Sequence, residues 1–385
     1  MRILVNTLSL APATGIDVHV WQVSRELAAR GHIVDVSAQR DGAWHEEFEA
    51  CTHSVSIYGD FLHAPISLPQ LRRPAALAKW LLSFAQAVRG SRSRQPHVIY
   101  ANDQQSLMWA CAVAQRPRIP IVCHLHAHFG SWPLGHQRVM LARRVDTFIA
   151  PSASVRDSWT TAGLSPDRIV VIPQAVDPTA YPPATAASRR AVRAALGLDD
   201  DVFVALYLGR VVPGKGVDTL INAWRTLGLS PDVGQLLVVG SAYPATYLRE
   251  LSASAPRDSC RFFPLQADIV PLLHAADVTV VPSVYDEACP RVVIEAMATG
   301  CPVVASDSGG IPELLTGRFT TLLHQRGNSV QLAESLKRLL NWRQTQPSLA
   351  DACVAHVKAS YTLSAAVDGI ESVLKVATTR RWRDK

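Results

Sequence analysis

Short apolar runs alternate with segments of helical apolar spacing along most of the chain. In the first half, an apolar run at residues 3–5 is followed by helical spacing at about 18–30, closed by Gly31, and then by a second run at 34–37. Strands buried on both faces of a sheet are continuously apolar, whereas the helices that cover them carry one apolar face. The alternation therefore predicts an α/β fold with parallel strands and crossover helices.

The same alternation restarts in the second half of the chain. A strand is expected at 202–208, a loop at 209–216 and a helix at 217–227, with further buried strands at 236–239, 278–281 and 302–305. Because 385 residues exceed what one core usually organises, two domains are expected. The proline-rich segment 177–183 lacks periodicity and predicts the linker. We expect domains at 1–178 and 179–362, with a helix in 363–385 that packs back on the first domain.

Composition narrows the class of protein and its partners. With 48% hydrophobic and 18% charged residues the chain is globular, and its net charge of +6 comes without a stripe of basic and aromatic residues. This excludes nucleic acid and favours an anionic nucleotide or an acidic membrane surface. The seven cysteines are scattered without CxxC spacing, so reduced thiols in a cytoplasmic protein are expected. Residues 1–6 resemble a strand rather than a secretory signal, and the apolar segment 75–88 is too short to cross a bilayer.

Two carboxylates flank a predicted helix start in the second half. Glu287 precedes Pro290, which suits the first helical position, and Glu295 follows on the helix that Gly300 should close. Free amides at 288–291 would form a partial positive charge that can hold an anion. A ligand pocket between the carboxylates is one interpretation, and an ordinary capped helix with an acidic first turn is the other.

Glycine-rich loops follow two of the predicted strands. In the loop 209–216, Arg210 and Lys215 can converge on a diphosphate, or they can be two solvated cations. The loop is not a Walker loop, because the GxxxxGK[ST] spacing is missing. A second run, Ser308-Gly309-Gly310, repeats the arrangement before a helix start, where free amides could contact a sugar.

Two groups of residues raise the question of a metal. Histidines 124, 126 and 128 follow a strand at period two, so they should share one face, but no carboxylate or cysteine at ligand spacing completes a zinc site. A histidine that faces a sugar at the strand end is favoured. The run Asp199-Asp200-Asp201 lies between a helix and a strand, which indicates a solvated turn rather than an Asp-x-Asp metal site. No metal is expected.

Taken together, these blocks resemble family 4 of the glycosyltransferases, a retaining group with the GT-B fold. The resemblance covers nearly the whole chain. It is carried by the Glu-x7-Glu block at 287–295 with the following Ala-Met-Ala-x-Gly-x-Pro-Val-Val, by the Gly-Arg-x-x-x-x-Lys-Gly loop at 209–216, and by the Gly-Gly-x-Pro-Glu run at 309–313. It implies two Rossmann-like, doubly wound parallel-sheet domains that face a central cleft. The first would bind the acceptor and the second the donor.

The resemblance also implies roles for single residues. Arg210 and Lys215 would hold the donor diphosphate, Glu295 the ribose, and Glu287 the donor sugar. His126 would contact the sugar near the reacting centre, and Gly15 would approach it from the first domain. The remaining donor-binding positions implied are Gln266, Ala288, Cys289, Pro290, Arg291 and Val292. Pro264, where the family has a glycine, leaves the base open among uridine, guanosine and adenosine, with a UDP-sugar as the default.

The implied activity is metal-independent transfer of a sugar from a nucleotide diphosphate, with retention and without a cofactor, to a hydroxyl of a small molecule, glycan or lipid-linked acceptor. The alternatives are a catalytically silent nucleotide-sugar-binding protein and a nucleotide-sugar epimerase of the same fold. A dinucleotide oxidoreductase lacks its GxGxxG signature here. The basic tail 380–385 is either a solvated terminus or a peripheral contact with the inner face of a membrane.

Overall fold

The computed structural model describes residues 1–383 apart from 13, 62–73, 116–117 and 131–141, with no side-chain description for 74 and 380–383. Its contacts divide the chain into two compact units. Unit 1 contains residues 1–173 and 363–385, and unit 2 contains residues 174–362. The division falls at Pro173, ahead of the boundary at 178 that the proline-rich segment predicts.

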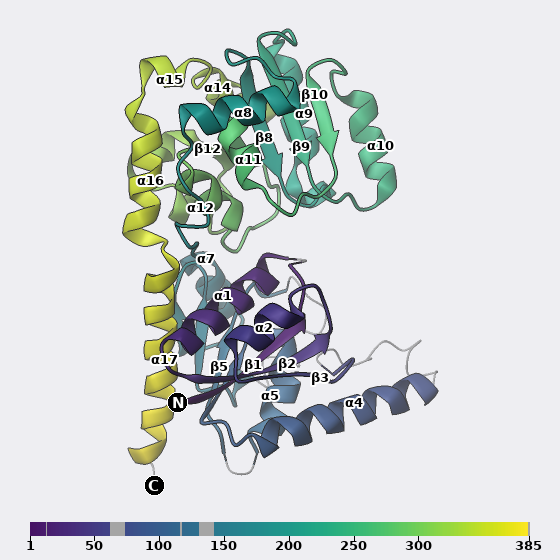
Figure 1. The fold of residues 1–385 in the computed structure, drawn as a ribbon, viewed down its shortest axis with the longest axis vertical. Helices are drawn as coiled ribbons and strands as arrows, with labels where there is room; N and C mark the ends of the chain where they lie inside the picture. Colours follow the sequence, from purple (N-terminus) through teal and green to yellow (C-terminus); the bar gives the residue numbers. More distant parts are fainter. Residues whose placement is uncertain (13, 62–73, 116–117, 131–141, 384–385) are drawn as a thin grey trace. The chain divides into compact units, whose positions relative to one another are not determined.

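The described residues of unit 1 form a seven-stranded, wholly parallel sheet with the order β3-β2-β1-β4-β5-β6-β7 (Figure 1). Its strands are β1 (Arg2–Ser9), β2 (Ile33–Arg40), β3 (Ser54–Ile57), β4 (Val98–Ala101), β5 (Ile121–His124), β6 (Thr147–Ala150) and β7 (Ile169–Val171). Its helices are α1 (Gly15–Ala29), α2 (His45–Cys51), α4 (Pro74–Ser93), α5 (Leu107–Val113), α7 (Ala153–Thr161) and α17 (Leu363–Arg383), with 3-10 turns η1 (Gln104–Ser106) and η2 (Pro166–Arg168).

The core of unit 1 joins segments from both ends of the sequence. Ile3 and Val5 of β1 and Val98 of β4 are fully buried in one cluster with Val367 and Ile370 of α17. Helix α17 packs on α1 and on the central strands (Figure 1). Helix α17, at the end of the sequence, therefore forms one of the layers that pack on the first sheet.

The described residues of unit 2 form a six-stranded parallel sheet with the order β10-β9-β8-β11-β12-β13. Its strands are β8 (Phe203–Leu208), β9 (Gly234–Val239), β10 (Cys260–Phe263), β11 (Val278–Val281), β12 (Val303–Ser306) and β13 (Leu323–His324). Its helices are α8 (Ala186–Leu196), α9 (Val217–Leu227), α10 (Ala245–Ser254), α11 (Val270–Ala275), α12 (Arg291–Ala298), α13 (Ile311–Leu314), α14 (Ser329–Lys337), α15 (Trp342–Thr345) and α16 (Ser348–Ser360), with 3-10 turns η3 (Pro213–Lys215) and η4 (Gly317–Leu322).

The two doubly wound parallel sheets expected from the sequence are confirmed. In each sheet the strand order reverses beside the first strand, between β1 and β4 in unit 1 and between β8 and β11 in unit 2. Open α/β sheets bind ligands at the carboxyl ends of the strands at this reversal. The loops that follow β1, β4, β8 and β11 are therefore the places to examine for a site.

Candidate functional site

The loop after β8 is held against the segment after β11 by its glycines. Gly216 has φ +68°, and a Cβ on it would lie 2.0 Å from the carbonyl oxygen of Pro282. The amide of Val284 donates to the carbonyl of Gly214 (3.0 Å). No other residue type would allow this approach of the two backbones. The contact brings Lys215 to Glu287.

Lys215 and Glu287 form an ion pair at the carboxyl edge of the second sheet. The Lys215 Nζ lies 2.6 Å from Glu287 Oε1 and 5.2 Å from the centre of the Tyr285 ring. The hydroxyl of Ser283 donates to the same carboxylate oxygen. Burial alone would lower the pKa of Lys215, but the charge and hydrogen bond of Glu287 outweigh it and raise the pKa. Lys215 therefore carries its positive charge at neutral pH.

The glycine run 308–310 fixes the backbone of Glu287. The amide of Gly310 donates to the Glu287 carbonyl (2.7 Å), and a Cβ on Gly309, at φ +56°, would lie 2.2 Å from that oxygen. The hydroxyl of Ser308 donates to the carbonyl of Tyr285. The run thus positions a carboxylate, a structural use that the sequence pattern does not reveal.

Arg210 lies at the start of the same loop and extends into solvent. The Tyr207 hydroxyl donates to its backbone carbonyl (2.6 Å), which anchors the main chain. Among the residues that the structure describes, the guanidinium of Arg210 has no hydrogen-bond or ion-pair partner. Two cations, one paired and one open, are thus placed on one loop.

Glu295 is buried on α12 and held by two donors. The Tyr181 hydroxyl donates to its Oε1 (3.1 Å), as does Nε of Arg291 (3.2 Å). Arg291 also donates through Nη1 to the carbonyl of Ala175 (2.8 Å), whereas its buried Nη2 has no partner in the described part of the chain. A buried guanidinium nitrogen without a partner is costly, so this atom is a place for a ligand oxygen.

The remaining positions expected in the donor site lie at the start of α12, except Gln266, which follows β10. Pro290 is the N-cap of α12 rather than its first residue, because its ψ of 114° is extended. Cys289 is buried, and burial raises the pKa of its thiol to about 12, so it is no nucleophile. Ala288 and Val292 are half-buried, and Gln266 donates to the carbonyl of Pro264 (3.1 Å) in the turn after β10.

In unit 1, one asparagine lies within β1 and another directly follows β4. The amide of Asn102 donates to Oδ1 of Asn6 (2.9 Å), and Oδ1 of Asn102 lies 3.2 Å from Nε2 of His126. Burial lowers the pKa of His126 to about 4, so its ring is neutral at neutral pH. His126 is thus tied to the strand reversal of the first sheet.

The first helix begins ahead of the helical spacing that the sequence shows from about residue 18. Thr14 is the N-cap of α1 and Gly15 its first residue, because Thr14 and Asp17 form a capping box. The Thr14 amide donates to the Asp17 carboxylate (2.9 Å), and the Asp17 amide donates to the Thr14 hydroxyl (3.4 Å). Gly15 therefore offers a helix N-terminus, and it is exposed.

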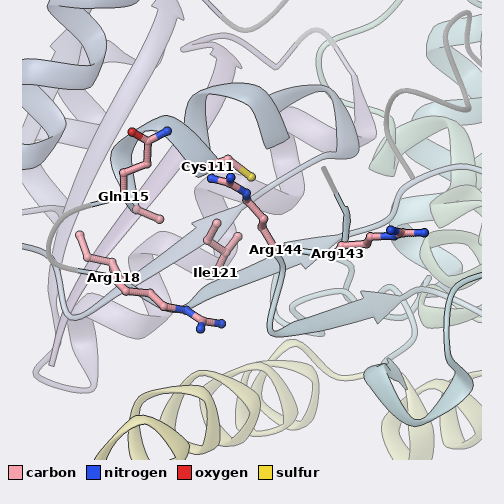
Figure 2. A pocket seen from close by; sticks show the side chains of 8 residues that line it. Cys111, Gln115, Arg118, Ile121, Arg143 and Arg144 are labelled. Atoms are coloured by element: carbon pink, nitrogen blue, oxygen red, sulfur yellow. The ribbon is translucent and has the colours of Figure 1, made fainter. Parts of the chain in front are cut away.

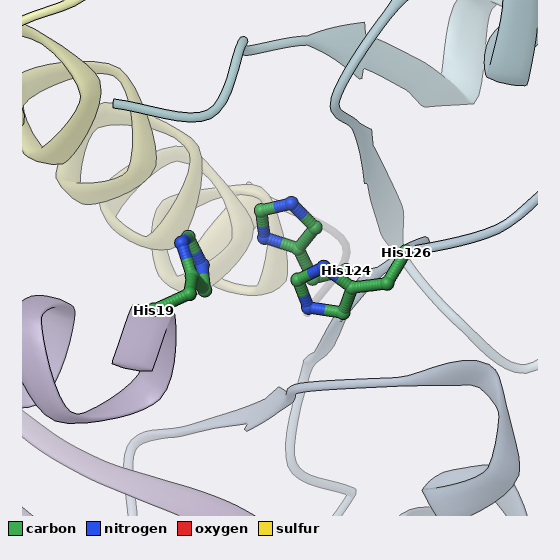
Figure 3. Close-up of side chains that lie close together, drawn as sticks. All are labelled: His19, His124 and His126. Carbon is green, nitrogen blue, oxygen red and sulfur yellow. The ribbon is translucent and has the colours of Figure 1, made fainter. Parts of the chain in front are cut away.

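The expectation that histidines 124, 126 and 128 share one strand face is wrong. Strand β5 ends at His124, and His128 turns away, with its Nε2 2.9 Å from the Ser154 hydroxyl. The rings of His124 and His126 stack at 4.3 Å, and the third imidazole beside them is His19 of α1 (Figure 3). Asp199 to Asp201 form an exposed turn, in which the carbonyls of Asp199 and Asp200 accept from Arg193.

A cavity of about 390 Å³ opens at the other edge of the first sheet (Figure 2). It lies beside the amino ends of β5 and β6, away from the strand reversal, and is lined by Cys111, Ala114, Gln115, Arg118, Ile119, Ile121, Arg143 and Arg144. Nη2 of Arg118, one of these lining residues, lies 3.7 Å from Oδ1 of Asp146. Its place at the amino ends separates it from Asn102 and His126, which follow the carboxyl ends of β4 and β5.

Three residues of this geometry have no signal in the sequence pattern. Tyr181 lies in the proline-rich segment, and Ser283 and Tyr285 lie in a loop without periodicity. The Arg291–Glu295 pair, by contrast, has the i, i+4 spacing of a helical ion pair.

In the described part of the chain, every helix is too short or too polar to cross a membrane.

Two family models match the chain, Glycosyltransferase Family 4 over residues 13–180 and Glycosyl transferases group 1 over residues 188–353. A D-inositol 3-phosphate glycosyltransferase of Corynebacterium diphtheriae is 30% identical over 407 residues, which cover 97% of this chain and 94% of that relative. A GDP-mannose-dependent monoacylated alpha-(1-6)-phosphatidylinositol monomannoside mannosyltransferase of Corynebacterium glutamicum is 28% identical over 66% of this chain and 70% of its own.

Among solved structures, HepE of Anabaena in complex with UDP-glucose superposes with a TM-score of 0.82 at 25% identity, covering 98% of this chain and 100% of that one. The matches extend over both units. The chain belongs to family 4 of the glycosyltransferases, the group 1 glycosyl transferases, and is a glycosyltransferase with the GT-B fold.

Proposed function

We propose that the chain transfers a sugar from a UDP-sugar to a hydroxyl acceptor, with retention of the anomeric configuration and without a metal ion. The observation that carries the proposal is the Lys215–Glu287 pair at the strand reversal of unit 2, beside the open guanidinium of Arg210. A paired and an open cation on one glycine loop suit a ligand that carries both a diphosphate and hydroxyl groups.

Arg210 and Lys215 neutralise the diphosphate as it leaves. Negative charge grows on the phosphate in the transition state, and fixed cations aimed at that charge lower the barrier. The acceptor oxygen forms a bond to the anomeric carbon while the bond from that carbon to the phosphate oxygen breaks. The acceptor proton passes to the leaving phosphate, so no separate protein base is required.

Glu295 and Glu287 accept hydrogen bonds from the donor. We assign Glu295 to the ribose hydroxyls, held by Tyr181 and Arg291, and Glu287 to hydroxyls of the sugar. The unpartnered Nη2 of Arg291 is available to a donor oxygen beside Glu295. The assignment of Gly15 and His126 to the donor sugar rests on the family resemblance.

The base is proposed to be uracil. HepE, which is similar over nearly the whole chain, is solved with UDP-glucose, whereas the mannosyltransferase of C. glutamicum is named as dependent on GDP-mannose. The named relatives act on an inositol phosphate or a phosphatidylinositol glycan. We therefore propose a small-molecule, glycan or lipid-linked hydroxyl as acceptor, and a cytoplasmic enzyme that can contact the inner membrane face.

Calorimetry with UDP, GDP and ADP, followed by transfer assays with the matching sugar nucleotides after exhaustive chelation, tests the proposal. We expect UDP to bind most tightly, transfer to continue without metal, and proton NMR to show the donor's anomeric configuration in the product. Loss of activity with chelator and recovery with manganese or magnesium would contradict the metal-free mechanism, and an inverted product would contradict retention.

Variants of the two glutamates separate their roles. We expect Glu295→Ala chiefly to weaken UDP binding, whereas Glu287→Ala chiefly lowers kcat, because only Glu287 faces the reacting sugar. Steady-state kinetics with calorimetry measures both effects. Equal losses in donor KM alone for both variants would contradict the assignment.

A further inference from the structure

Three imidazoles from separate segments of unit 1 meet near the carboxyl ends of its central strands (Figure 3). His19 comes from α1, His124 ends β5, and His126 follows two residues later. One potential ligand nitrogen from each lies within 4.8 Å of the others. We call these three residues the histidine cluster.

His124 presents a buried nitrogen that has no partner. Its side chain is 1% exposed, and its Nδ1 lies 2.7 Å from the Tyr100 hydroxyl, which in turn lies 3.1 Å from Nε2 of His19. In the described part of the chain its Nε2 has no hydrogen-bond partner. The tautomer with the proton on Nδ1 donates to Tyr100 and leaves the Nε2 lone pair open to a cation.

Two imidazole rings of the cluster are in the neutral form that can bind a metal. Burial, then the charges of His126 and His19, hold the pKa of His124 well below its usual range, and burial alone lowers that of His126. Both rings are therefore neutral at neutral pH, and no proton has to leave before they bind a metal.

We propose that the histidine cluster binds a borderline transition-metal dication of the Zn²⁺ class. Three imidazoles with a fourth position for water are an established ligand set for zinc. At Zn–N distances of about 2.0–2.1 Å, tetrahedral ligand nitrogens lie roughly 3.3 Å apart, so the widest separation has to close by up to about 1.5 Å. Tyr100 then acts as the outer partner that orients His124.

The proposed ion takes no part in the transfer chemistry proposed above, which uses no metal, but it shares one residue with that site. A bound ion occupies His126, which the proposed function assigns to the donor sugar, so zinc should inhibit transfer. That consequence rests on the proposed function, whereas metal binding itself does not.

The test uses the full chain, stripped of metal by chelation. Calorimetric titration with Zn²⁺ should show one saturable equivalent, and Co²⁺ should give the intense visible absorption of a tetrahedral complex. His19→Asn and His124→Asn should each weaken binding by more than about 100-fold, because removal of a ligand exceeds the loss of an outer partner. His128→Asn is the matched control, since His128 lies on the same segment but bonds Ser154, and it should bind unchanged.

Circular dichroism confirms that each variant is folded. Tyr100→Phe, which keeps every ligand and removes only the outer hydroxyl, should bind about 10-fold more weakly. Absence of a saturable equivalent in the unmodified chain, an octahedral Co²⁺ spectrum, or unchanged affinity in His19→Asn or His124→Asn would each overturn the metal site. None of these results affects the UDP-binding test, so the two proposals fail independently.

Discussion

At the scale of single residues, Lys215 is engaged before any donor arrives. Its ammonium lies between the Glu287 carboxylate and the face of Tyr285. Both partners favour the charged form, and the pKa of Lys215 is raised. In the proposed function, a diphosphate would therefore meet a cation that is already held in position, and Glu287 would exchange this bond for a sugar hydroxyl.

The two cations of the loop give the first prediction. Lys215→Ala and Arg210→Ala should each weaken UDP binding roughly 10- to 150-fold, because a charge-assisted contact contributes about 1.5–3 kcal/mol. Calorimetry with UDP measures the change. The matched control is Arg257→Ala, which removes an exposed arginine elsewhere in unit 2 and should leave affinity unchanged. Unchanged affinity in both loop variants would remove the loop from the site.

The pKa of His126 gives a second prediction, on stability. Its pKa of about 4 in the folded chain lies below the value near 6.5 of an unfolded histidine. Between these pH values the unfolded chain binds more protons, so stability falls as pH drops from about 6.5 to about 4. The contribution of His126 to this fall is at most about 3 kcal/mol. Urea unfolding of the unmodified chain and of His126→Gln measures how far the free energy of unfolding falls between about pH 6.5 and about pH 4. We expect a smaller fall in the variant, and equal falls in the two chains would contradict the prediction.

The sequence predicts which cations and carboxylates belong to the candidate site, but it does not predict all of the residues that contact them. Arg210, Lys215, Glu287 and Glu295 lie in motifs with distinctive spacing, and the structure places all four in unit 2. The partners of Glu295 include Tyr181, which is 114 residues away along the chain. Such a contact is set by tertiary packing, for which a local pattern carries no signal.

At the scale of elements, Asp277 ties two helices, α8 and α15, to the start of β11. Its carboxylate lies 2.6 Å from Arg189 and from Arg193 of α8, and 2.7 Å from Arg343 of α15. Arg193 is fully buried and donates also to the carbonyls of Ala275 and Val202. Burial lowers the pKa of Arg189 to about 10 despite the charge of Asp277.

The third prediction concerns this cluster. Asp277→Ala should lower the free energy of unfolding of unit 2 by about 3–5 kcal/mol, because it leaves a buried guanidinium without its anion. Denaturant unfolding measures the loss, and Asp258→Ala, at an exposed position, is the control that should change little. A loss below about 1 kcal/mol would show that the backbone carbonyls alone hold the arginines.

The elements themselves follow closely from the apolar pattern. The predicted helix at 217–227 and the strand at 278–281 coincide with α9 and β11, because both are apolar on the faces that the sheet buries. The helical spacing predicts a start of α1 at about residue 18, three residues late, because its first turn is set by the Thr14–Asp17 capping box rather than by apolar spacing. The grouping of His124 and His126 with His19 needs the packing of α1 on the sheet, which periodicity does not contain.

At the scale of the whole molecule, the chain leaves unit 1 after Pro173 and returns to it at Leu363. Val367, Ile370 and Leu374 of α17 are fully buried in the core of the first sheet. Arg30 of unit 1 donates to Asp368 and Glu371 on the same helix. Hydrogen bonds from Lys375, His32 and Arg30 lower the pKa of Glu371 to about 2. The returning helix is thus tied to unit 1 by both apolar and polar contacts.

The fourth prediction follows from this return. Removal of residues 363–385 should unfold or strongly destabilise unit 1, because it exposes the sheet surface that α17 covers, while unit 2 should keep its own cooperative transition. Differential scanning calorimetry of the truncated and full chains, with UDP added, separates the two. A truncated chain that keeps both transitions at their original temperatures would show that α17 is dispensable.

The return of α17 also bears on the order in which the protein is made. Residues 174–362 leave the ribosome as a continuous stretch and can close their sheet during synthesis, whereas the first 173 residues, although translated earlier, lack one layer of their core until residue 374 has emerged. Unit 1 therefore stays incomplete while unit 2 folds, and the apolar surface of its central strands stays exposed during that time. The half that is synthesised first is expected to be completed last, and during that interval it is the half exposed to aggregation and to chaperones.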